Sequence, residues 1–177
     1  MKTKLKILHL EDSPADAELE ERELKKGNIQ FEKLVVGTKT ALEKALKDFA
    51  PDIIISDHTL PSVNSTEAVK IINQQGIKIP FILVSATVSD DYAVEIMKAG
   101  ADDYILKDRL HRLPQAVLKA MEKYRAELNL QAIFDSTSEG FILVDTNGIV
   151  KTFNTITAQN ILLNTEQELK IGSSVYD

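Results

Sequence analysis

The sequence contains no cysteine. This absence excludes disulfide bonds, thiolate metal sites, iron–sulfur clusters and cysteine nucleophiles. No uncharged apolar run approaches the ~18–20 residues of a transmembrane helix. The apolar stretch between Met1 and Leu10 is also too short for a signal peptide. Because a reducing compartment is compatible with these absences, we predict a soluble, cytoplasmic chain with no membrane partner.

Basic residues are not in excess either. The 21 Lys and Arg residues are outnumbered by 27 Asp and Glu residues, which gives a net charge of −6. Since a dedicated nucleic-acid binder presents a basic face, we expect no nucleic acid among the partners of this chain. Hydrophobic residues make up 44% and charged residues 27% of the 177 residues. This composition is ordinary for a globular protein, and the length suffices for one full domain and a remainder.

Short apolar segments alternate with helical segments from residue 4 to about residue 110. The apolar segments are too short for helices and predict five strands, Leu5–Leu10, Phe31–Val36, Ile53–Ser56, Phe81–Val84 and Asp103–Leu106. Spacing and capping residues predict helices over residues 14–26, 40–49, 66–75 and 90–99, and a last helix from near Arg109. Strict alternation predicts an α/β fold, a flavodoxin-like (βα)5 doubly wound five-stranded parallel sheet of order 2-1-3-4-5.

The last helix continues beyond the point where such a domain ends. Its apolar residues recur three or four positions apart and form one stripe, Leu113, Val117, Met121, Tyr124, Leu128 and Ala132. Part of this extended C-terminal helix must cover the sheet, and the part after Tyr124 needs another partner. Pairing of two copies as a short coiled coil, which makes a homodimer, is favoured over a helix bent back onto its own domain.

Residues 136–177 differ in character from the rest. Residues 141–144 predict a strand, the Asp-Thr-Asn-Gly segment at 145–148 a turn, and residues 149–153 the returning strand. Two short helices are expected over residues 157–163 and 165–170. Because one hairpin with two short helices is marginally stable at best, we expect the front of a domain whose remainder is absent.

Polar side chains stand where the predicted strands end. Glu11 and Asp12 follow the first strand, and Asp57 follows the third. Ser85 follows the fourth strand and Lys107 the fifth. In a doubly wound sheet, ligands bind at the carboxyl ends of the strands, by the switch point between strands 1 and 3. The carboxylates are therefore expected to converge at that place.

Three carboxylates packed together repel one another unless a cation is present. A hard divalent ion, Mg²⁺ or Mn²⁺, removes that repulsion. Lys107 adds a point charge for a phosphate and Ser85 a hydroxyl, so the set predicts a phosphoryl-transfer site with a carboxylate nucleophile. Each residue alone is better explained as an acidic helix start, a cap or a surface ion pair. Their occurrence at successive strand ends favours the functional interpretation.

These residues resemble the receiver domain of two-component response regulators over about residues 4–125. The resemblance rests on Glu11-Asp12, on Asp57 followed by Leu60-Pro61, on Ser85-Ala86, and on the run from Ala99 to Tyr104 that leads to Lys107. It implies a phosphorelay switch that catalyses its own phosphorylation and dephosphorylation. Asp57 would accept a phosphoryl group from a phosphohistidine on a histidine kinase or a histidine phosphotransfer protein.

The resemblance also implies a role for each site residue. Magnesium would be bound by Asp12, by Asp57 and by the backbone carbonyl of Thr59, with Glu11 acting through water. Lys107 would hold a phosphoryl oxygen. On activation Ser85 would move to the phosphate and Tyr104 would turn inward, and the output surface would be formed by helix 4, strand 5 and helix 5.

Three residues depart from the family's pattern. Asp108 follows Lys107 where the family has proline after a cis bond, so either a cis non-proline bond forms at a cost of ~2.5–4 kcal/mol or the loop differs. Ser65 stands where glycine is common, which predicts a differently shaped loop after Asp57. His58 is unusual next to the nucleophile, and an outward-facing side chain is the simpler interpretation than a titrating group.

The tail resembles the opening of a PAS sensory domain. The resemblance rests on residues 133–145, on Gly148 and on Phe153-Asn154, and covers about 45 residues of a domain that needs about 100. We therefore predict a receiver domain over 1–123, a helical connector over 124–135 and an incomplete PAS-like segment over 136–177. Receivers fused ahead of PAS modules resemble this arrangement, and the parent protein would be a hybrid histidine kinase, a cyclase or another regulator.

Other functions fit the residues less well. A pseudo-receiver that serves as a dimerisation module would require a broken acidic trio or a missing lysine, and both are intact here. A phosphatase of the aspartyl-phosphate type would carry an acid two residues after the nucleophile, where this chain has Thr59. A flavodoxin would offer phosphate donors after the first strand, where this chain has acids.

Overall fold

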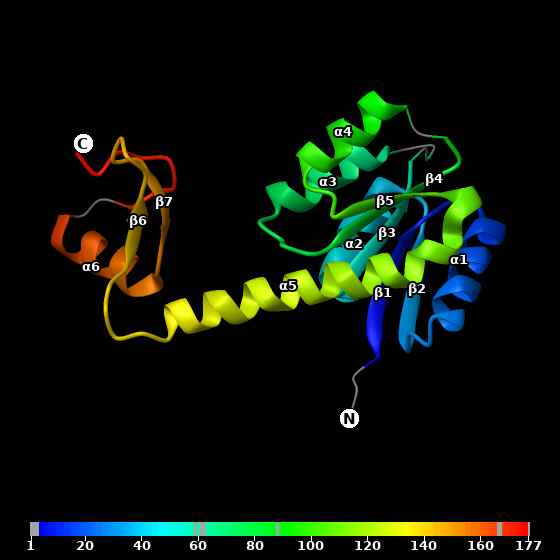
Figure 1. Ribbon diagram of the computed structural model, residues 1–177, viewed down its shortest axis with the longest axis horizontal. Coiled ribbons are helices and arrows are strands. Elements are labelled where there is room, and N and C mark those ends of the chain that lie inside the picture. Colours follow the sequence, from blue (N-terminus) through cyan, green and yellow to red (C-terminus); the bar gives the residue numbers. More distant parts are fainter. Residues whose placement is uncertain (1–3, 59, 61–62, 88, 166–167, 177) are drawn as a thin grey trace. The chain divides into compact units, whose positions relative to one another are not determined.

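The computed structural model describes residues 4–58, 60, 63–87, 89–165 and 168–176 (Figure 1). The chain divides into two compact units, Met1–Tyr124 and Arg125–Asp177. Within the described part of the chain, no helix combines the length and apolar character that crossing a bilayer requires.

The first unit is built on a parallel sheet of five strands. The strands are β1 (Leu5–Leu10), β2 (Phe31–Val36), β3 (Ile53–Asp57), β4 (Phe81–Ser85) and β5 (Asp103–Leu106). Their order is β2-β1-β3-β4-β5, and every neighbouring pair is parallel. The predicted flavodoxin-like fold is therefore confirmed, and β3 and β4 each run one residue further than expected.

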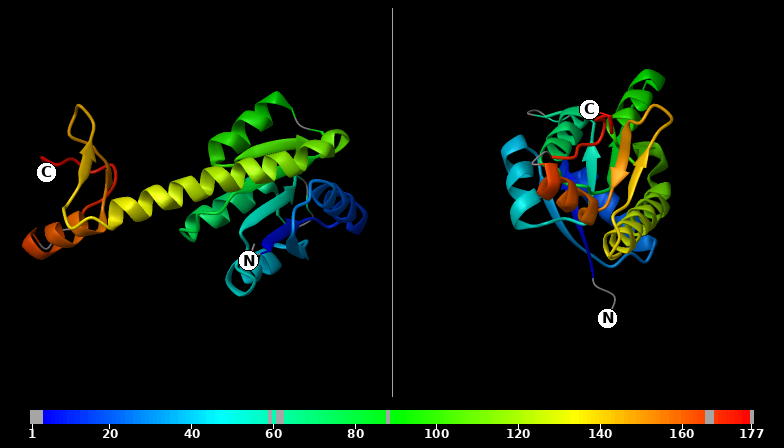
Figure 2. Two further views of the ribbon diagram at one scale, coloured as in Figure 1. Left: turned by 60° about the horizontal axis from the view of Figure 1, so that its bottom comes forward. Right: turned by 90° about the vertical axis from the view of Figure 1, so that its left-hand side faces the viewer.

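Helices cover both faces of this sheet (Figures 1 and 2). They are α1 (Pro14–Lys26), α2 (Lys39–Asp48), α3 (Ser65–Gln74), α4 (Asp90–Ala99) and α5 (Leu113–Asp135). Ser13 caps α1, because its side chain accepts a hydrogen bond from the Asp16 N–H at 3.3 Å. Gly100 ends α4 with a φ of 116°, a left-handed conformation that glycine adopts without steric cost.

Two hydrophobic layers hold the sheet in place. Strand residues such as Ile7, Ile55 and Ile105 point toward α1 and α5, whose buried side chains include Leu24 and Val117. The alternate residues of the strands pack against α2, α3 and α4. Because the central strands are buried on both faces, they read as continuous apolar runs in the sequence.

The connection after β5 differs from the expected start of the last helix. Residues Lys107–Arg112 form a 3-10 helix, inside which Arg109 has non-helical dihedral angles, and α5 begins only at Leu113. The Lys107–Asp108 peptide bond is trans. Of the two possibilities expected from the sequence, the structure has the altered loop after Lys107 and not the cis peptide bond.

The predicted apolar stripe of α5 is buried along only part of its length. Leu113, Val117 and Met121 are buried against the sheet, and Tyr124 is partly buried. Further along, Leu128 is 49% exposed, and Leu130, on the other side of the helix, is 69% exposed. The second half of α5 thus presents apolar side chains that the described residues leave uncovered.

The second unit contains an antiparallel hairpin and one helix. Strands β6 (Ile142–Val144) and β7 (Val150–Phe153) pair, and α6 (Thr155–Thr165) follows. The helix expected over residues 165–170 is wrong, because residues 168–170 are not helical. Backbone hydrogen bonds tie this tail to β7 instead, since Gly172 donates to Val150 and Val150 donates to Ser173.

Asn154 anchors the second unit. It is fully buried, and its side-chain oxygen accepts from the Phe141 N–H at 2.9 Å and from the Thr157 hydroxyl at 2.7 Å. Its amide nitrogen donates to the Glu139 carbonyl at 2.8 Å and to the Thr137 hydroxyl at 3.1 Å. One side chain therefore ties the hairpin, the loop before it and the start of α6 together.

Candidate functional site

The carboxyl ends of β1 and β3 bring three acidic side chains together. Glu11, Asp12 and Asp57 each offer an oxygen, and these oxygens all lie within 4.8 Å of one another. Register explains the convergence, because Leu10 lies opposite Ser56 across the β1–β3 pair and the acids come next in each chain direction. Glu11 is buried, Asp57 is partly buried and Asp12 is exposed, so the cluster runs from the interior to the surface.

Lys107 enters this cluster from the end of β5. Its ammonium group donates to Asp16 Oδ2 at 2.5 Å, to Glu11 Oε2 at 3.1 Å and to Asp57 Oδ2 at 3.2 Å. Burial lowers the pKa of Lys107, but the hydrogen bonds to Asp16 and Glu11 outweigh burial and raise that pKa above its ordinary value. Lys107 is therefore a fixed positive charge at neutral pH.

The pKa of Glu11 is raised as well, but for a carboxyl group a raised pKa disfavours the charged form. Only 3% of this residue is exposed, and burial raises the pKa of its carboxyl above the ordinary value, with Asp57 adding to the rise. Hydrogen bonds from the Ser13 N–H, at 2.9 Å, and from Lys107 oppose the rise without cancelling it. The protein groups around Glu11 therefore stabilise its negative charge only in part, and a bound cation would stabilise it further.

The cluster fits a divalent metal ion. Carboxylate oxygens are the protein ligands that magnesium prefers, and three converge here from two neighbouring strands. The three carboxylates carry more negative charge than the single ammonium group of Lys107 can balance. A bound cation would balance the remaining negative charge. The predicted contribution of Thr59 lies outside the described residues.

Asp16 is a member of this site that sequence reasoning did not assign to it. In the sequence it stands at the start of α1, where an acid stabilises the helix. The same helix start lies beside the sheet edge, so the Asp16 carboxylate reaches Lys107. Its position in the first turn of the helix that directly follows Glu11 and Asp12 is the signal that could have identified it.

In the described part of the chain, the other two predicted residues, Ser85 and Tyr104, have hydrogen bonds or exposure that do not involve the carboxylates. Ser85 is buried at the end of β4, and its hydroxyl donates to the Thr87 carbonyl at 2.8 Å. Tyr104 is 38% exposed. It lines a shallow hollow of about 500 Å³ with four residues of α4, Ala93, Val94, Met97 and Lys98.

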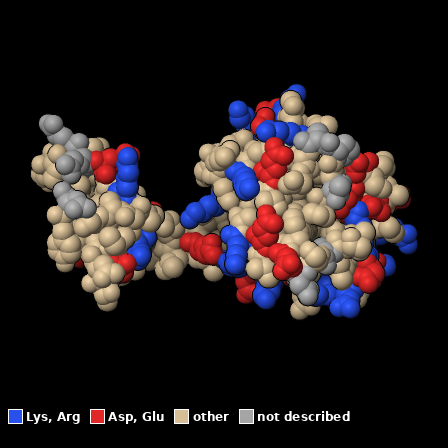
Figure 3. All heavy atoms as spheres, turned by 90° about the horizontal axis from the view of Figure 1, so that it is seen from above, with Lys and Arg blue, Asp and Glu red and all other residues tan. Residues whose placement is uncertain are grey.

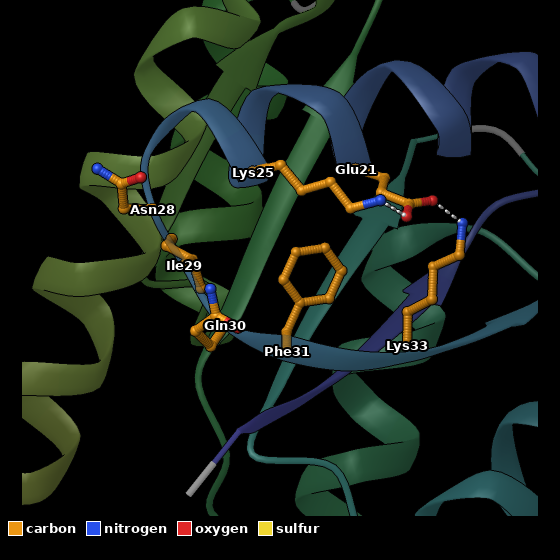
Figure 4. A pocket seen from close by; sticks show the side chains of 7 residues that line it. All are labelled: Glu21, Lys25, Asn28, Ile29, Gln30, Phe31 and Lys33. Atoms are coloured by element: carbon orange, nitrogen blue, oxygen red, sulfur yellow. Dashed lines mark hydrogen bonds and ion pairs between the residues drawn. The ribbon is translucent and has the colours of Figure 1, made fainter. Parts of the chain in front are cut away.

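A separate hollow of about 450 Å³ lies between the end of α1 and the start of β2 (Figure 4). Lys25 and Lys33 both point toward Glu21 there, and Phe31 lies between them. Hydrogen bonds from Lys25 and then Lys33 lower the pKa of Glu21 to about 2. Because both ammonium groups are paired with Glu21, this hollow offers no convergence of like charges comparable to that of the strand-end cluster.

Charges of both signs are interspersed over the visible face of the first unit (Figure 3). Lys and Arg side chains alternate there with Asp and Glu side chains rather than gathering in one broad area. The charged side chains of this face thus form no single broad patch of one sign.

Comparisons with known sequences agree with this geometry. The family model described as the response regulator receiver domain matches residues 7–118. The response regulator ArlR of Staphylococcus aureus (strain Mu50) is 34% identical over 164 residues, which cover 92% of this chain and 69% of that protein. The regulatory protein AtoC of Escherichia coli (strain K12) is 31% identical over 113 residues, which cover 60% of this chain and 24% of that protein.

Solved structures resemble the first unit in the same way. The receiver domain of the Francisella response regulator 1452 superposes with a TM-score of 0.60 at 26% identity, covering 68% of this chain and 99% of that one. The receiver domain of the sensor histidine kinase PA1611 from Pseudomonas aeruginosa PAO1 has a magnesium ion coordinated in its active site cleft. It superposes with a TM-score of 0.58 at 20% identity, covering 68% of this chain and 99% of that one, a likeness of fold.

Proposed function

Because this chain belongs to the family of response regulator receiver domains, we propose that Asp57 is its phosphoacceptor. Receiver domains of response regulators take phosphoryl groups from histidine kinases. The donor for this chain is a phosphohistidine on a histidine kinase or a histidine phosphotransfer protein. The observation that carries the proposal is the position of Asp57 Oδ2, which lies 3.2 Å from Lys107 Nζ and beside the carboxylates that end β1.

The transfer forms one bond and breaks one. A carboxylate oxygen of Asp57 attacks phosphorus, the P–O bond forms and the P–N bond of the phosphohistidine breaks. The leaving imidazole nitrogen keeps the electron pair and takes up a proton. Lys107 holds a phosphoryl oxygen as negative charge moves toward the site.

Magnesium is the metal ion that we propose for this reaction, because receiver domains bind magnesium in their acidic active site. We propose that Asp12 and Asp57 hold it directly, that Glu11 acts through water, and that the carbonyl of Thr59 is the further ligand. When bound, the ion supplies neutralisation of the phosphoryl oxygens. The relative from Pseudomonas aeruginosa with magnesium in its active site cleft supports this assignment.

The test is the intact mass of the chain after incubation with phosphoramidate, a small donor that contains a P–N bond. The parent protein should gain one phosphoryl group when magnesium is present and none when the metal is chelated beforehand. Asp57→Ala should gain none, whereas Asp48→Ala, a change at an exposed acid of α2, should behave as the parent does. Equal labelling of the parent and Asp57→Ala would refute the assignment.

Two further residues form the proposed switch. Ser85 donates to the Thr87 carbonyl and Tyr104 is exposed. Phosphorylation of Asp57 would draw the Ser85 hydroxyl to the phosphoryl group, and Tyr104 would turn inward into the space that is vacated. The surface formed by α4, β5 and α5 would then carry the output.

The output passes, in this proposal, through α5 into residues 136–177 as the opening of a PAS-like module. We propose a receiver over 1–123, a connector over 124–135 and a PAS-like segment over 136–177, and the boundary between the two compact units supports the end of the receiver. Phe141, Ile142 and Leu143 are exposed on the hairpin, as expected of strands that belong to a larger sheet. The parent protein would be a hybrid histidine kinase, a cyclase or another regulator.

One observation favours a second function, dimerisation, which a pseudo-receiver would carry out without phosphorylation. Apolar side chains on α5 beyond Tyr124 are exposed, including Leu128. A second copy of the helix would cover this stripe as a short coiled coil. If the chain dimerises while the Asp57 chemistry is absent, this pseudo-receiver function replaces the first.

A further inference from the structure

The two unusual residues near Asp57, His58 and Ser65, meet in one hydrogen-bonded cluster. His58 Nδ1 lies 3.4 Å from the Ser65 hydroxyl. The same hydroxyl lies 2.6 Å from the Tyr92 hydroxyl, which also lies 3.0 Å from the Thr66 hydroxyl. The imidazole of His58 packs against the ring of Tyr92, with 4.0 Å between the ring centroids. The cluster thus joins the end of β3, the start of α3 and the first turn of α4.

This cluster is connected to the phosphoacceptor through the backbone. The His58 N–H donates to Asp57 Oδ1 at 2.6 Å. The other oxygen of Asp57, Oδ2, faces Lys107. If His58 is held in place, its N–H keeps its hydrogen bond to Oδ1 of Asp57, and Oδ2 stays directed toward Lys107.

We propose that His58, held by Ser65 and Tyr92, is a positioning residue for phosphorylation of Asp57. This inference rests on the function proposed above. The imidazole does not touch the reacting atoms. It holds the residue that follows Asp57, so that the carboxylate keeps one orientation for attack on phosphorus. Catalysis of phosphoryl transfer depends largely on such positioning, and a misplacement of about 1 Å is costly.

Burial supports a positioning role over a chance surface contact. Ser65 is fully buried, Thr66 is buried, and both His58 and Tyr92 are partly buried. Without Tyr92, the buried Ser65 hydroxyl would lose the shorter of its two contacts and keep only the longer one to His58, which is unfavourable for a buried hydroxyl. The residues are therefore mutually dependent, and removal of one loosens the others.

Tyr92→Phe removes one hydroxyl from the cluster and keeps the ring against His58. We expect the maximal rate of labelling by phosphoramidate to fall about fivefold, as for the loss of one buried hydrogen bond. The magnesium concentration at half-maximal rate should stay unchanged, since the hydrogen bonds of the Tyr92 hydroxyl in the described structure go to Ser65 and Thr66 and not to the acidic cluster. Tyr124→Phe, a hydroxyl deletion on a partly buried tyrosine of α5, is the matched control and should label as the parent does.

A rescue series separates positioning from stability. His58→Ala should slow labelling, and His58→Asn should recover part of the rate, because its amide offers a hydrogen-bonding atom near the place of Nδ1. Ser65→Ala combined with Tyr92→Phe should slow labelling no more than the slower single change, because both remove the same interaction. All rates are measured at a temperature where circular dichroism shows each variant to be folded.

Rates equal to the parent rate for Tyr92→Phe and His58→Ala would overturn the inference, whether or not the variants unfold at lower temperature. Labelling of the parent at Asp57 with unchanged variants would leave the proposed function standing and remove the positioning role alone. An unlabelled parent would remove both.

Discussion

At the scale of single residues, charge and burial set the properties of the site. Lys107 is shared among three carboxylates, of which only Glu11 and Asp57 belong to the expected set. Asp16 makes the shortest of these contacts, at 2.5 Å. A charge-assisted hydrogen bond of this kind competes with any other anion for the same ammonium group.

Removing that competitor should speed phosphorylation. In Asp16→Asn the ammonium group of Lys107 is held less strongly and is more available to a phosphoryl oxygen. We expect the rate of labelling by phosphoramidate to rise about threefold, as for the loss of one modest charge interaction. The control is Glu18→Gln, a charge deletion at an exposed site on the same helix. A slower Asp16→Asn variant would show instead that Asp16 helps to place Lys107.

Burial of Glu11 gives a pH dependence whose sign is fixed. Folding raises the pKa of this carboxyl above its ordinary value of 4.5, chiefly through burial. As the pH rises through 4.5, the unfolded chain loses this proton first, so the free energy of unfolding falls until the folded chain loses it too. Without metal, Glu11→Gln should remove this decrease and be more stable than the parent near neutral pH.

Urea unfolding from pH 4 to pH 8 in the presence of a chelator checks this expectation. Magnesium should narrow the difference between the two proteins, because the ion balances the buried charge in the parent. A difference that is constant across the pH range would contradict the assigned cause.

At the scale of elements, the strands of the sheet could be predicted because the apolar pattern of each strand is local in the sequence. Short continuous apolar runs such as Ile53–Ile55 are typical of strands buried on both faces, and strict alternation with helices favours a parallel sheet of this order. The strand ends then placed Glu11, Asp12 and Asp57 together.

Contacts between distant side chains could not be predicted in this way. The Asp16–Lys107 contact joins residues 91 positions apart, and the Ser65–Tyr92 contact joins residues 27 positions apart. Their formation depends on how helices pack after the sheet has formed. The trans bond after Lys107 likewise depends on the 3-10 turn that replaces the family's usual loop.

The packing of α1 against α5 can be tested at one glycine. A Cβ added at Gly27 would overlap the ring of Pro114 at the start of α5. Gly27→Ala should therefore lower the free energy of unfolding by about 1–3 kcal/mol, as overpacking does. A Cβ added at Gly37 would lie 3.5 Å from its nearest neighbouring atom, which is an ordinary contact. Gly37→Ala therefore serves as the control, and thermal unfolding of both variants measures the difference in stability. Equal stabilities of the two variants would show that α5 can shift away.

At the scale of the whole molecule, the proposed dimer requires a defined face of α5. Leu128 continues the stripe of Leu113, Val117 and Met121, whereas Leu130 lies on the other side of the helix. Both leucines are exposed. If two copies pair along the stripe, Leu128→Lys should yield monomers and Leu130→Lys should leave the dimer intact.

Light scattering at several protein concentrations measures this directly. A parent protein that remains monomeric at every concentration would contradict the dimer. Dissociation by Leu130→Lys alone would show that the opposite side of the helix forms the contact.

The proposed function depends on Asp57 as the site of phosphorylation. The most direct measurement is the position of the phosphoryl group, obtained by borohydride reduction of the labelled protein followed by peptide mass spectrometry. Reduction converts a phosphorylated aspartate to homoserine, and we predict this conversion at Asp57. Homoserine at Asp12 or Asp16, or no homoserine in protein that has gained a phosphoryl group, would contradict the account.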